Sequence, residues 1–139
     1  MKYKFRAWLI KEKRWADSVT VFGDGSFSVS IKRGDFTEEG DGEGQAVLSI
    51  FTGRKDKHGT EVYTGDIVMP KEKVGMREFN PITGKVEPLE VYWDEEELQL
   101  RLRNRRNRFT RELEFIDFVI GTVFETPELL DPKVRKFTP

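Results

Sequence analysis

The chain has 139 residues, the size of one domain or of two very small subdomains that share a core. It is 37% hydrophobic, 35% charged and 12% aromatic, which excludes a disordered chain because eleven Phe and three Trp can form a core. The net charge of −1 excludes overall steering to nucleic acid or anionic lipid, and the lack of cysteine excludes disulfides and thiolate metal sites.

The first fifty residues predict a β-meander of about three strands. Apolar and basic side chains alternate over residues 2–7, the period of two that is typical of a half-buried strand. Residues 19–22 and 27–31 have the same strand character. Residues 34–44 combine glycines with five acids, which predicts a flexible acidic loop and a candidate boundary.

The rest of the chain predicts short strands separated by Gly and Pro turns. The strand candidates are residues 47–51, 61–63, 66–69, 85–93 with a kink at Pro88, 98–102 and 115–124. Residues 53–59 are expected to form a turn-rich connection, and residues 111–117 could instead form a helical turn. Thr126 as a cap and Pro127 as the first helical residue predict a short helix that Pro132 ends.

This spacing predicts a mainly β fold, with an N-terminal β-meander packed with a small SH3-like barrel and one short C-terminal helix. We expect a single domain over residues 1–139. Its subdomains would be the meander at 1–50, the small β-barrel at 51–131 and a frayed tail at 132–139. The predicted core residues are Phe5, Trp8, Phe51, Val62, Ile67, Val91, Trp93, Leu100, Ile120 and Val123.

Three segments resemble the YopX family, small proteins found mostly in phages and prophages of Gram-positive bacteria. They are residues 4–15, 51–68 and 119–130, so the resemblance spans about residues 3–131. It implies a YopX-like fold and a phage origin, but no activity, because none is established for the family. The signature residues, for which we expect structural roles, are Phe51, Thr52, Gly53, Asp56, Gly59, Tyr63, Gly65 and Asp66.

Two positions depart from the family pattern. Leu9 follows the first Trp where the family often has an acid, and His58 stands where the family commonly has Asn. His58 is the only imidazole in the chain, so it could be a general base or a metal ligand. The alternative is a turn residue before Gly59, since Asn and His both tolerate a positive φ.

The carboxylates offer little catalytic chemistry. Asp94–Glu97 could bind Mg²⁺ or Ca²⁺, but four consecutive acids are more typical of a solvated turn. Asp66 follows Gly65 and is expected to cap a turn. A hydrolase with a carboxylate-bound metal is a remote alternative. We therefore expect no enzyme, no cofactor and no metal site.

The strongest local charge is a run of six arginines within eleven residues. Guanidinium groups bind phosphate, and the interleaved Asn and Phe side chains could contact bases, so the run is a candidate nucleic-acid site. The arginines could instead pair with Asp94–Glu97 or form a subunit interface. They are Arg101, Arg103, Arg105, Arg106, Arg108 and Arg111.

The sequence thus favours a non-enzymatic, phage-encoded binding protein that acts through contacts with an unknown host or phage protein, with homo-oligomers also expected. The alternative is a nucleic-acid-binding accessory protein that uses the run Arg101–Arg111. We find no signal peptide and no apolar stretch of the ~20 residues that span a bilayer, so we expect a cytoplasmic protein without membrane contact.

Overall fold

The computed structural model describes residues 4–69, 88–104, 109–112 and 118–130. These residues form strands and a single 3₁₀ turn, so the mainly β fold predicted from the sequence is confirmed. The chain divides into two compact units, Met1–Ile50 (unit 1) and Phe51–Pro139 (unit 2). No helix among the described residues is long and apolar enough to span a membrane.

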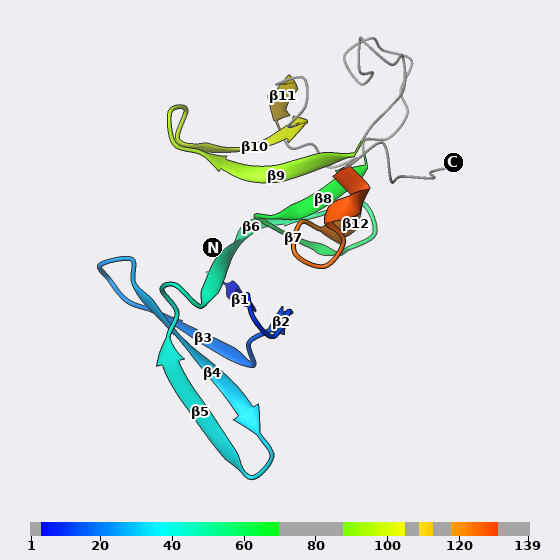
Figure 1. The fold of residues 1–139 in the computed structure, drawn as a ribbon. Helices are drawn as coiled ribbons and strands as arrows, with labels where there is room; N and C mark the ends of the chain where they lie inside the picture. Colours follow the sequence, from blue (N-terminus) through cyan, green and yellow to red (C-terminus); the bar gives the residue numbers. More distant parts are fainter. Residues whose placement is uncertain (1–3, 70–87, 105–108, 113–117, 131–139) are drawn as a thin grey trace. The chain divides into compact units, whose positions relative to one another are not determined.

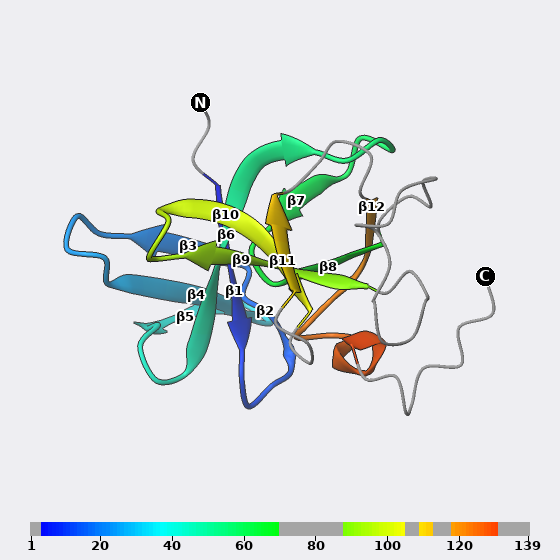
Figure 2. The same cartoon turned by 90° about the horizontal axis from the view of Figure 1, so that it is seen from above.

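Unit 1 consists of two small antiparallel sheets (Figure 1). In the first sheet, β1 pairs with β2 on one side and with the beginning of β6 on the other. In the second, β4 lies between β3 and β5, and Figure 2 shows these three strands side by side. The strands are β1 (Phe5–Leu9), β2 (Arg14–Trp15), β3 (Ser18–Val21), β4 (Phe27–Arg33), β5 (Phe36–Asp41) and β6 (Ala46–Lys55).

The core of unit 1 joins its two sheets. Ala7 and Leu9 of β1 pack with Val29 and Ile31 of β4, and all four side chains are buried. On β4 the alternation of Phe27, Val29 and Ile31 with serines predicts this face, whereas β1 buries Trp8 as well as Ala7 and Leu9 and so does not alternate at its end. Gly42 packs directly against the Phe27 ring. A Cβ at position 42 would lie 2.1 Å from a carbon of that ring, so a side chain would overlap it.

The predicted acidic loop at residues 34–44 is wrong, because residues 36–41 in its centre form β5. This strand pairs with β4 from Arg33 opposite Phe36 to Ser28 opposite Asp41. A two-residue loop joins the strands, and Gly34 supplies the positive φ of 63° that such a loop needs at its first position. Exposed acids are compatible with a strand whose backbone is paired along one edge. The division between the units falls at Ile50, inside β6, rather than in this segment.

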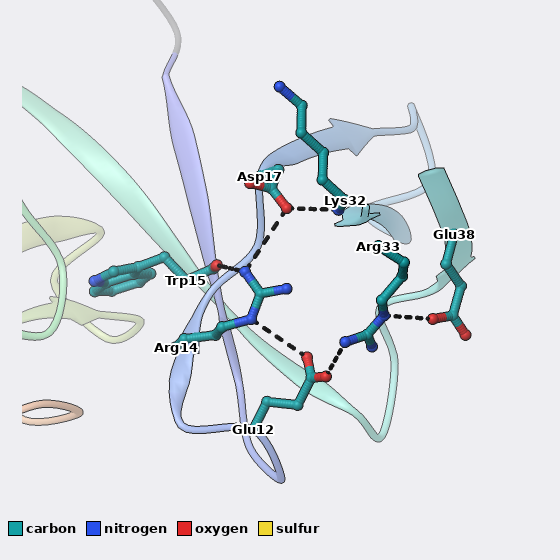
Figure 3. A network of polar contacts seen from close by, with 7 residues as sticks. All are labelled: Glu12, Arg14, Trp15, Asp17, Lys32, Arg33 and Glu38. Carbon is teal, nitrogen blue, oxygen red and sulfur yellow. Dashed lines mark hydrogen bonds and ion pairs between the residues drawn. The ribbon is translucent and has the colours of Figure 1, made fainter. Parts of the chain in front are cut away.

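A network of charged side chains ties the β1–β2 turn of unit 1 to its second sheet (Figure 3). Glu12 forms ion pairs with Arg14, at 3.7 Å, and with Arg33. Asp17 accepts a hydrogen bond of 2.7 Å from the backbone N–H of Lys32 and lies 3.7 Å from Arg14. The N–H donor and the nearby cations lower the pKa of Asp17 below its usual value.

Unit 2 is built on an antiparallel sheet of five strands in the order β11-β10-β9-β8-β12, which curls into a half-barrel. The end of β6 pairs with β7 through an irregular register between Phe51 and Lys55. The strands are β7 (Glu61–Tyr63), β8 (Asp66–Met69), β9 (Leu89–Asp94), β10 (Gln99–Asn104), β11 (Phe109–Glu112) and β12 (Phe118–Thr122), followed by the 3₁₀ turn η2 (Pro127–Leu130).

The core of unit 2 lies on one face of the half-barrel, where Val68, Leu89, Val91 and Leu102 are buried. Of the residues predicted as core across both units, four are buried: Trp8, Val62, Ile67 and Val91. Five are only half-buried: Phe5, Phe51, Leu100, Ile120 and Val123.

Trp93 was wrongly predicted as core, because 49% of its surface is exposed. It lies on the same strand as the buried Val91 but two residues nearer to the closed end of the β9–β10 hairpin, where the hydrophobic cluster ends. The prediction that Leu98 begins the strand of residues 98–102 is also wrong. It lies in the turn before β10, with a positive φ of 54° and an exposed side chain.

One predicted boundary changes as well. β6 extends to Lys55 through Gly53, whose φ of 82° accommodates the irregular register, so the connection predicted from residue 53 begins later. The terminal turn η2 begins at Pro127 as predicted, and the Thr126 carbonyl accepts the N–H of Leu129 at 3.1 Å, whereas the Thr126 hydroxyl bonds back to the amide and carbonyl of Thr122. The strand halves predicted at 85–87 and 115–117 lie outside the described residues.

Candidate functional site

Two of the six clustered arginines are described with their side chains, and both lie on β10 beside β9. In the antiparallel register, Arg101 stands opposite Tyr92 and Arg103 opposite Glu90. Successive strand residues point to opposite faces, so Arg101 and Arg103 share the face opposite to the buried Leu102. This face of the half-barrel is the candidate nucleic-acid site.

Both arginines have carboxylate partners on β9. The Nε of Arg103 lies 3.1 Å from Oε1 of Glu90, and its guanidinium stacks over the Tyr92 ring at 4.3 Å. The Nε of Arg101 lies 4.0 Å from Oδ2 of Asp94. Among the described side chains of this face, two cations therefore stand beside two anions, and each arginine lies within ion-pair distance of a carboxylate in the same sheet.

The partner Asp94 belongs to the acidic run that the sequence suggested, whereas Glu90 was not anticipated. Glu90 is 4% exposed, and a buried carboxylate is unusual unless a cation or N–H donors accompany it. A signal for it exists in the sequence, since Glu90 interrupts an apolar strand. Choosing Arg103 as its partner requires the β9–β10 register.

The other arginines of the run have a less complete description. Arg111 belongs to β11 and stands opposite Leu102 in the β10 register. Arg105, Arg106 and Arg108 lie outside the described residues. The contribution of these four side chains to a nucleic-acid site therefore stays a prediction.

The acidic run forms the turn between β9 and β10. Oδ1 of Asp94 accepts hydrogen bonds of 3.0 and 3.1 Å from the N–H groups of Glu96 and Glu97, which closes the turn from within. Glu95, Glu96 and Glu97 are all exposed. Within the described ranges, no group of three or more His, Cys, Asp or Glu residues is arranged to hold a metal ion.

Asp56, the first acid of the signature, is a buried connector between two distant parts of unit 2. Its Oδ1 accepts hydrogen bonds from the N–H groups of His58 at 2.9 Å and Thr60 at 3.0 Å. Its Oδ2 accepts a bond of 2.9 Å from the N–H of Val119 in β12, 63 residues further along the chain. The carboxylate thus shapes a turn and attaches the turn to the last strand.

The ionisation of Asp56 follows from these contacts. Burial of the carboxyl by itself would raise its pKa, but three N–H donors, first among them Val119, outweigh this and hold the pKa below its usual value. A carboxylate that stays charged and whose two oxygens both face backbone N–H groups is a poor general acid or base.

Gly65 and Asp66 shape the turn between β7 and β8 and connect it to neighbouring segments of unit 2. Oδ2 of Asp66 accepts a hydrogen bond of 2.7 Å from the N–H of Tyr63, across the turn that separates β7 from β8. Gly65 has a φ of 90°, donates its N–H to Val91 of β9 and accepts one from Val123. A side chain at position 65 would meet the Phe124 ring at 2.6 Å.

The remaining signature residues shape the β6–β7 hairpin. Phe51 stands opposite Tyr63, and their ring centroids are 5.5 Å apart. The Thr52 hydroxyl donates to the Val62 carbonyl at 2.7 Å and accepts the Arg54 N–H at 3.2 Å, spanning the irregular register at Gly53. Such hydroxyl bonds replace the ladder bonds that an irregular register leaves open.

His58 lies in the turn of the same hairpin. Its N–H bonds to Asp56, and its ring meets Phe118 edge to face with centroids 5.6 Å apart. His58 is therefore a turn residue, as the alternative predicted, but the positive φ in this turn belongs to Gly59, at 82°, and not to His58. The imidazole packs on an aromatic ring here and also interacts electrostatically with Asp56, whose pKa it helps to lower.

Comparisons with known proteins agree with this architecture. Protein EF1440 from Enterococcus faecalis has a crystal structure with a TM-score of 0.58 and 23% identity, and the match covers 94% of this chain and 99% of that one. Protein yopX from Bacillus subtilis has a TM-score of 0.57 and 19% identity, over 91% of this chain and 95% of that one. At these identities the likeness concerns the fold. No curated protein matches this chain.

The family comparison extends over most of the sequence. Residues 4–131 match the family described as YopX protein. The matched range includes all the signature residues whose contacts are given above. The chain therefore belongs to the YopX protein family.

Proposed function

We propose that this chain is a non-catalytic binding protein that acts through protein–protein contacts. The observation that carries the proposal is the pairing of Arg101 and Arg103 with Asp94 and Glu90 on the neighbouring strand. A phosphate that approached these guanidinium groups would have to displace carboxylates that are already in place. Non-specific nucleic-acid affinity comes almost wholly from uncompensated cations, so this arrangement favours a protein partner.

Two further features support a binding role rather than catalysis. The signature aspartates Asp56 and Asp66 accept hydrogen bonds from backbone N–H groups, which commits them to the fold. Large apolar side chains are exposed on both units, among them Phe36 at 65% and Leu98 at 72%. Exposed aromatic and aliphatic groups of this size are typical of contact surfaces for other proteins.

The proposal includes the cellular location of the protein and the kind of partner. The resemblance to a phage and prophage family supports a bacterial cytoplasm as the place of action, with a host protein, a phage protein or a second copy of the chain as the partner. The nucleic-acid alternative is favoured by one observation, the six arginines among residues 101–111. Those beyond Arg103 decide whether a net positive surface remains.

A titration of the chain with labelled single-stranded DNA, duplex DNA and RNA separates the two functions. Fluorescence anisotropy is measured at about 20 mM salt, where electrostatic binding is strongest, and at about 150 mM salt. The proposal predicts no saturable binding under either condition. The nucleic-acid function instead predicts binding that weakens steeply with salt.

Variants then locate any nucleic-acid binding that is seen. Loss of binding in a variant with Arg105, Arg106 and Arg108→Gln would establish the alternative function and overturn the proposal. Arg14→Gln and Arg33→Gln in unit 1 serve as a control for the general loss of positive charge. Both of these arginines lie in the network of Figure 3, away from the β10 segment in sequence.

A further inference from the structure

The closed end of the β9–β10 hairpin combines exposed apolar surface with negative charge. Trp93 is 49% exposed and Leu98 is 72% exposed, the highest value among the large hydrophobic residues described. Between them in sequence stand Glu95, Glu96 and Glu97, all exposed. We call these five residues, 93 and 95–98, the acidic tip.

The backbone keeps the tip in this form. Trp93 stands opposite Leu100, and Asp94 opposite Gln99, so the hairpin remains paired up to its turn. Within the turn, Asp94 accepts the N–H groups of Glu96 and Glu97. The exposed groups are therefore presented by a closed hairpin and not by a frayed end.

Leu98 is an unusual residue for its position in the turn. It adopts a positive φ of 54°, a conformation that favours Gly or Asn and is unfavourable for leucine. In addition, its side chain gains little from burial. A residue that suits neither its backbone nor its environment indicates a position used for something other than folding.

The charge around the apolar pair decides the kind of partner. Asp94 faces Arg101, so the sheet itself balances that acid. Glu95, Glu96 and Glu97 follow it in the turn and add three exposed negative charges between Trp93 and Leu98 in the sequence. Nucleic acid and anionic membranes are repelled by such a rim, whereas lysine and arginine side chains are attracted and an arginine can stack on the indole.

We propose that the acidic tip is the docking surface for a basic, apolar segment of a partner protein. The segment would place at least one large apolar side chain against Trp93 and Leu98, with Lys or Arg residues beside it facing Glu95–Glu97. This inference rests on the proposed function and names the surface and the chemistry of the partner. Trp as a partly exposed anchor with a charged rim is the composition expected of a binding hot spot.

The test selects peptides from a displayed random library on the immobilised full-length chain. The charge of the enriched sequences is compared with that of the starting library, and the affinities of enriched peptides are measured by anisotropy. One variant removes the apolar pair, Trp93→Ser with Leu98→Ser, and a second removes the charge, Glu95, Glu96 and Glu97→Gln. A control, Ile10→Ser with Phe22→Ser, removes apolar groups that are 50% and 51% exposed in unit 1.

Circular dichroism and thermal melting establish that each variant is folded before affinities are compared. We expect enriched peptides that pair large apolar residues with an excess of Lys and Arg. The apolar variant should bind them about tenfold or more weakly, as loss of a hot-spot anchor does, and the control should bind as the parent chain does. The charge variant should bind several-fold more weakly and with less dependence on salt.

Each contrary result points to a different failure. Peptides that bind the apolar variant as tightly as the parent chain overturn the tip as the site but leave the proposed protein-binding function intact. Peptides without a basic excess overturn the stated chemistry of the partner. A library that yields no enriched peptide overturns the inference, and together with nucleic-acid binding in the titration above it would overturn the proposed function. Self-association that the apolar variant abolishes would make a second copy the occupant.

Discussion

Replacing Asp56 by Asn should separate the structural role of the signature from any chemical role. The amide can keep one oxygen on the N–H groups of His58 and Thr60, but its NH₂ group then faces the N–H of Val119, and two donors cannot bond each other. Turning the amide around instead loses the other two bonds. Either orientation leaves at least one backbone donor of unit 2 without its acceptor.

The magnitude follows from the number of bonds affected. Asp56 is 3% exposed, so the Val119 N–H that loses its acceptor costs about 1–3 kcal/mol. The two remaining bonds lose the assistance of the negative charge, which adds roughly 0.5 kcal/mol each. We expect the free energy of unfolding to fall by about 2–4 kcal/mol, a large part of the 5–15 kcal/mol typical of a domain.

Urea denaturation followed by circular dichroism at neutral pH measures this loss. Asp24→Asn is the matched control, because Asp24 also accepts a backbone N–H in a turn, from Ser26 at 2.9 Å, but is exposed. We expect that variant to lose less than about 0.5 kcal/mol. Equal effects of the two substitutions would refute the conclusion that Asp56 joins the hairpin to β12.

The same substitution predicts a change in pH dependence. The pKa of Asp56 is lowered in the folded state, so its contribution to stability is complete above the unfolded pKa of about 3.9 and is lost as the pH falls through the lower folded pKa. The difference in unfolding free energy between the parent chain and Asp56→Asn should therefore narrow below about pH 4. A difference that stays constant through this range would contradict the assigned ionisation.

Three further predictions test the packing of the described residues. Gly65→Ala should lower the free energy of unfolding by about 2–4 kcal/mol, because a positive φ and the Phe124 ring both oppose a side chain. Gly25→Ala is the control, since Gly25 has the same φ of 90° but no atom near a Cβ, and it should cost about 1 kcal/mol. Both losses are measured by thermal melting. In urea denaturation, Leu102→Ala should lower the free energy of unfolding by about 2–5 kcal/mol, because its side chain is fully buried. Leu98→Ala should change it hardly at all, because that side chain is exposed. Similar losses for the two variants would show that the core is misassigned. Trp93→Ala should cost clearly less than the roughly 3–5 kcal/mol of a buried aromatic, as judged by the urea midpoint, and a full loss would contradict its exposure.

Strands with a regular alternation could be predicted from the sequence because the alternation is local. Residues 5–7 of the alternating stretch 2–7 lie within β1, and residues 99–102 of the stretch 98–102 lie within β10. β5 could not be predicted in this way. Its Gly and acid content is typical of a loop, and its strand conformation depends on pairing with β4, which no short segment reveals.

In the candidate site too, contacts between neighbours in the sequence could be predicted, whereas contacts between distant residues could not. The turn role of Asp66 follows from the adjacent Gly65 and needs no knowledge of the fold. The bond between Asp56 and Val119 joins residues 63 positions apart, so only the assembled unit reveals it. The exposure of Trp93 likewise depends on where the core ends and not on the residue type.

The central claim is that the described arginines are held by carboxylates of their own sheet, and a double-mutant cycle on Arg103 and Glu90 tests it most directly. Unfolding free energies are measured for the parent chain, Arg103→Gln, Glu90→Gln and the double variant. Because the contact is 3.1 Å long and Glu90 is buried while Arg103 is partly exposed, we predict a coupling energy of about 1–2 kcal/mol. A coupling energy near zero would mean that Glu90 does not hold Arg103, leaving this guanidinium available to phosphate and favouring the nucleic-acid function.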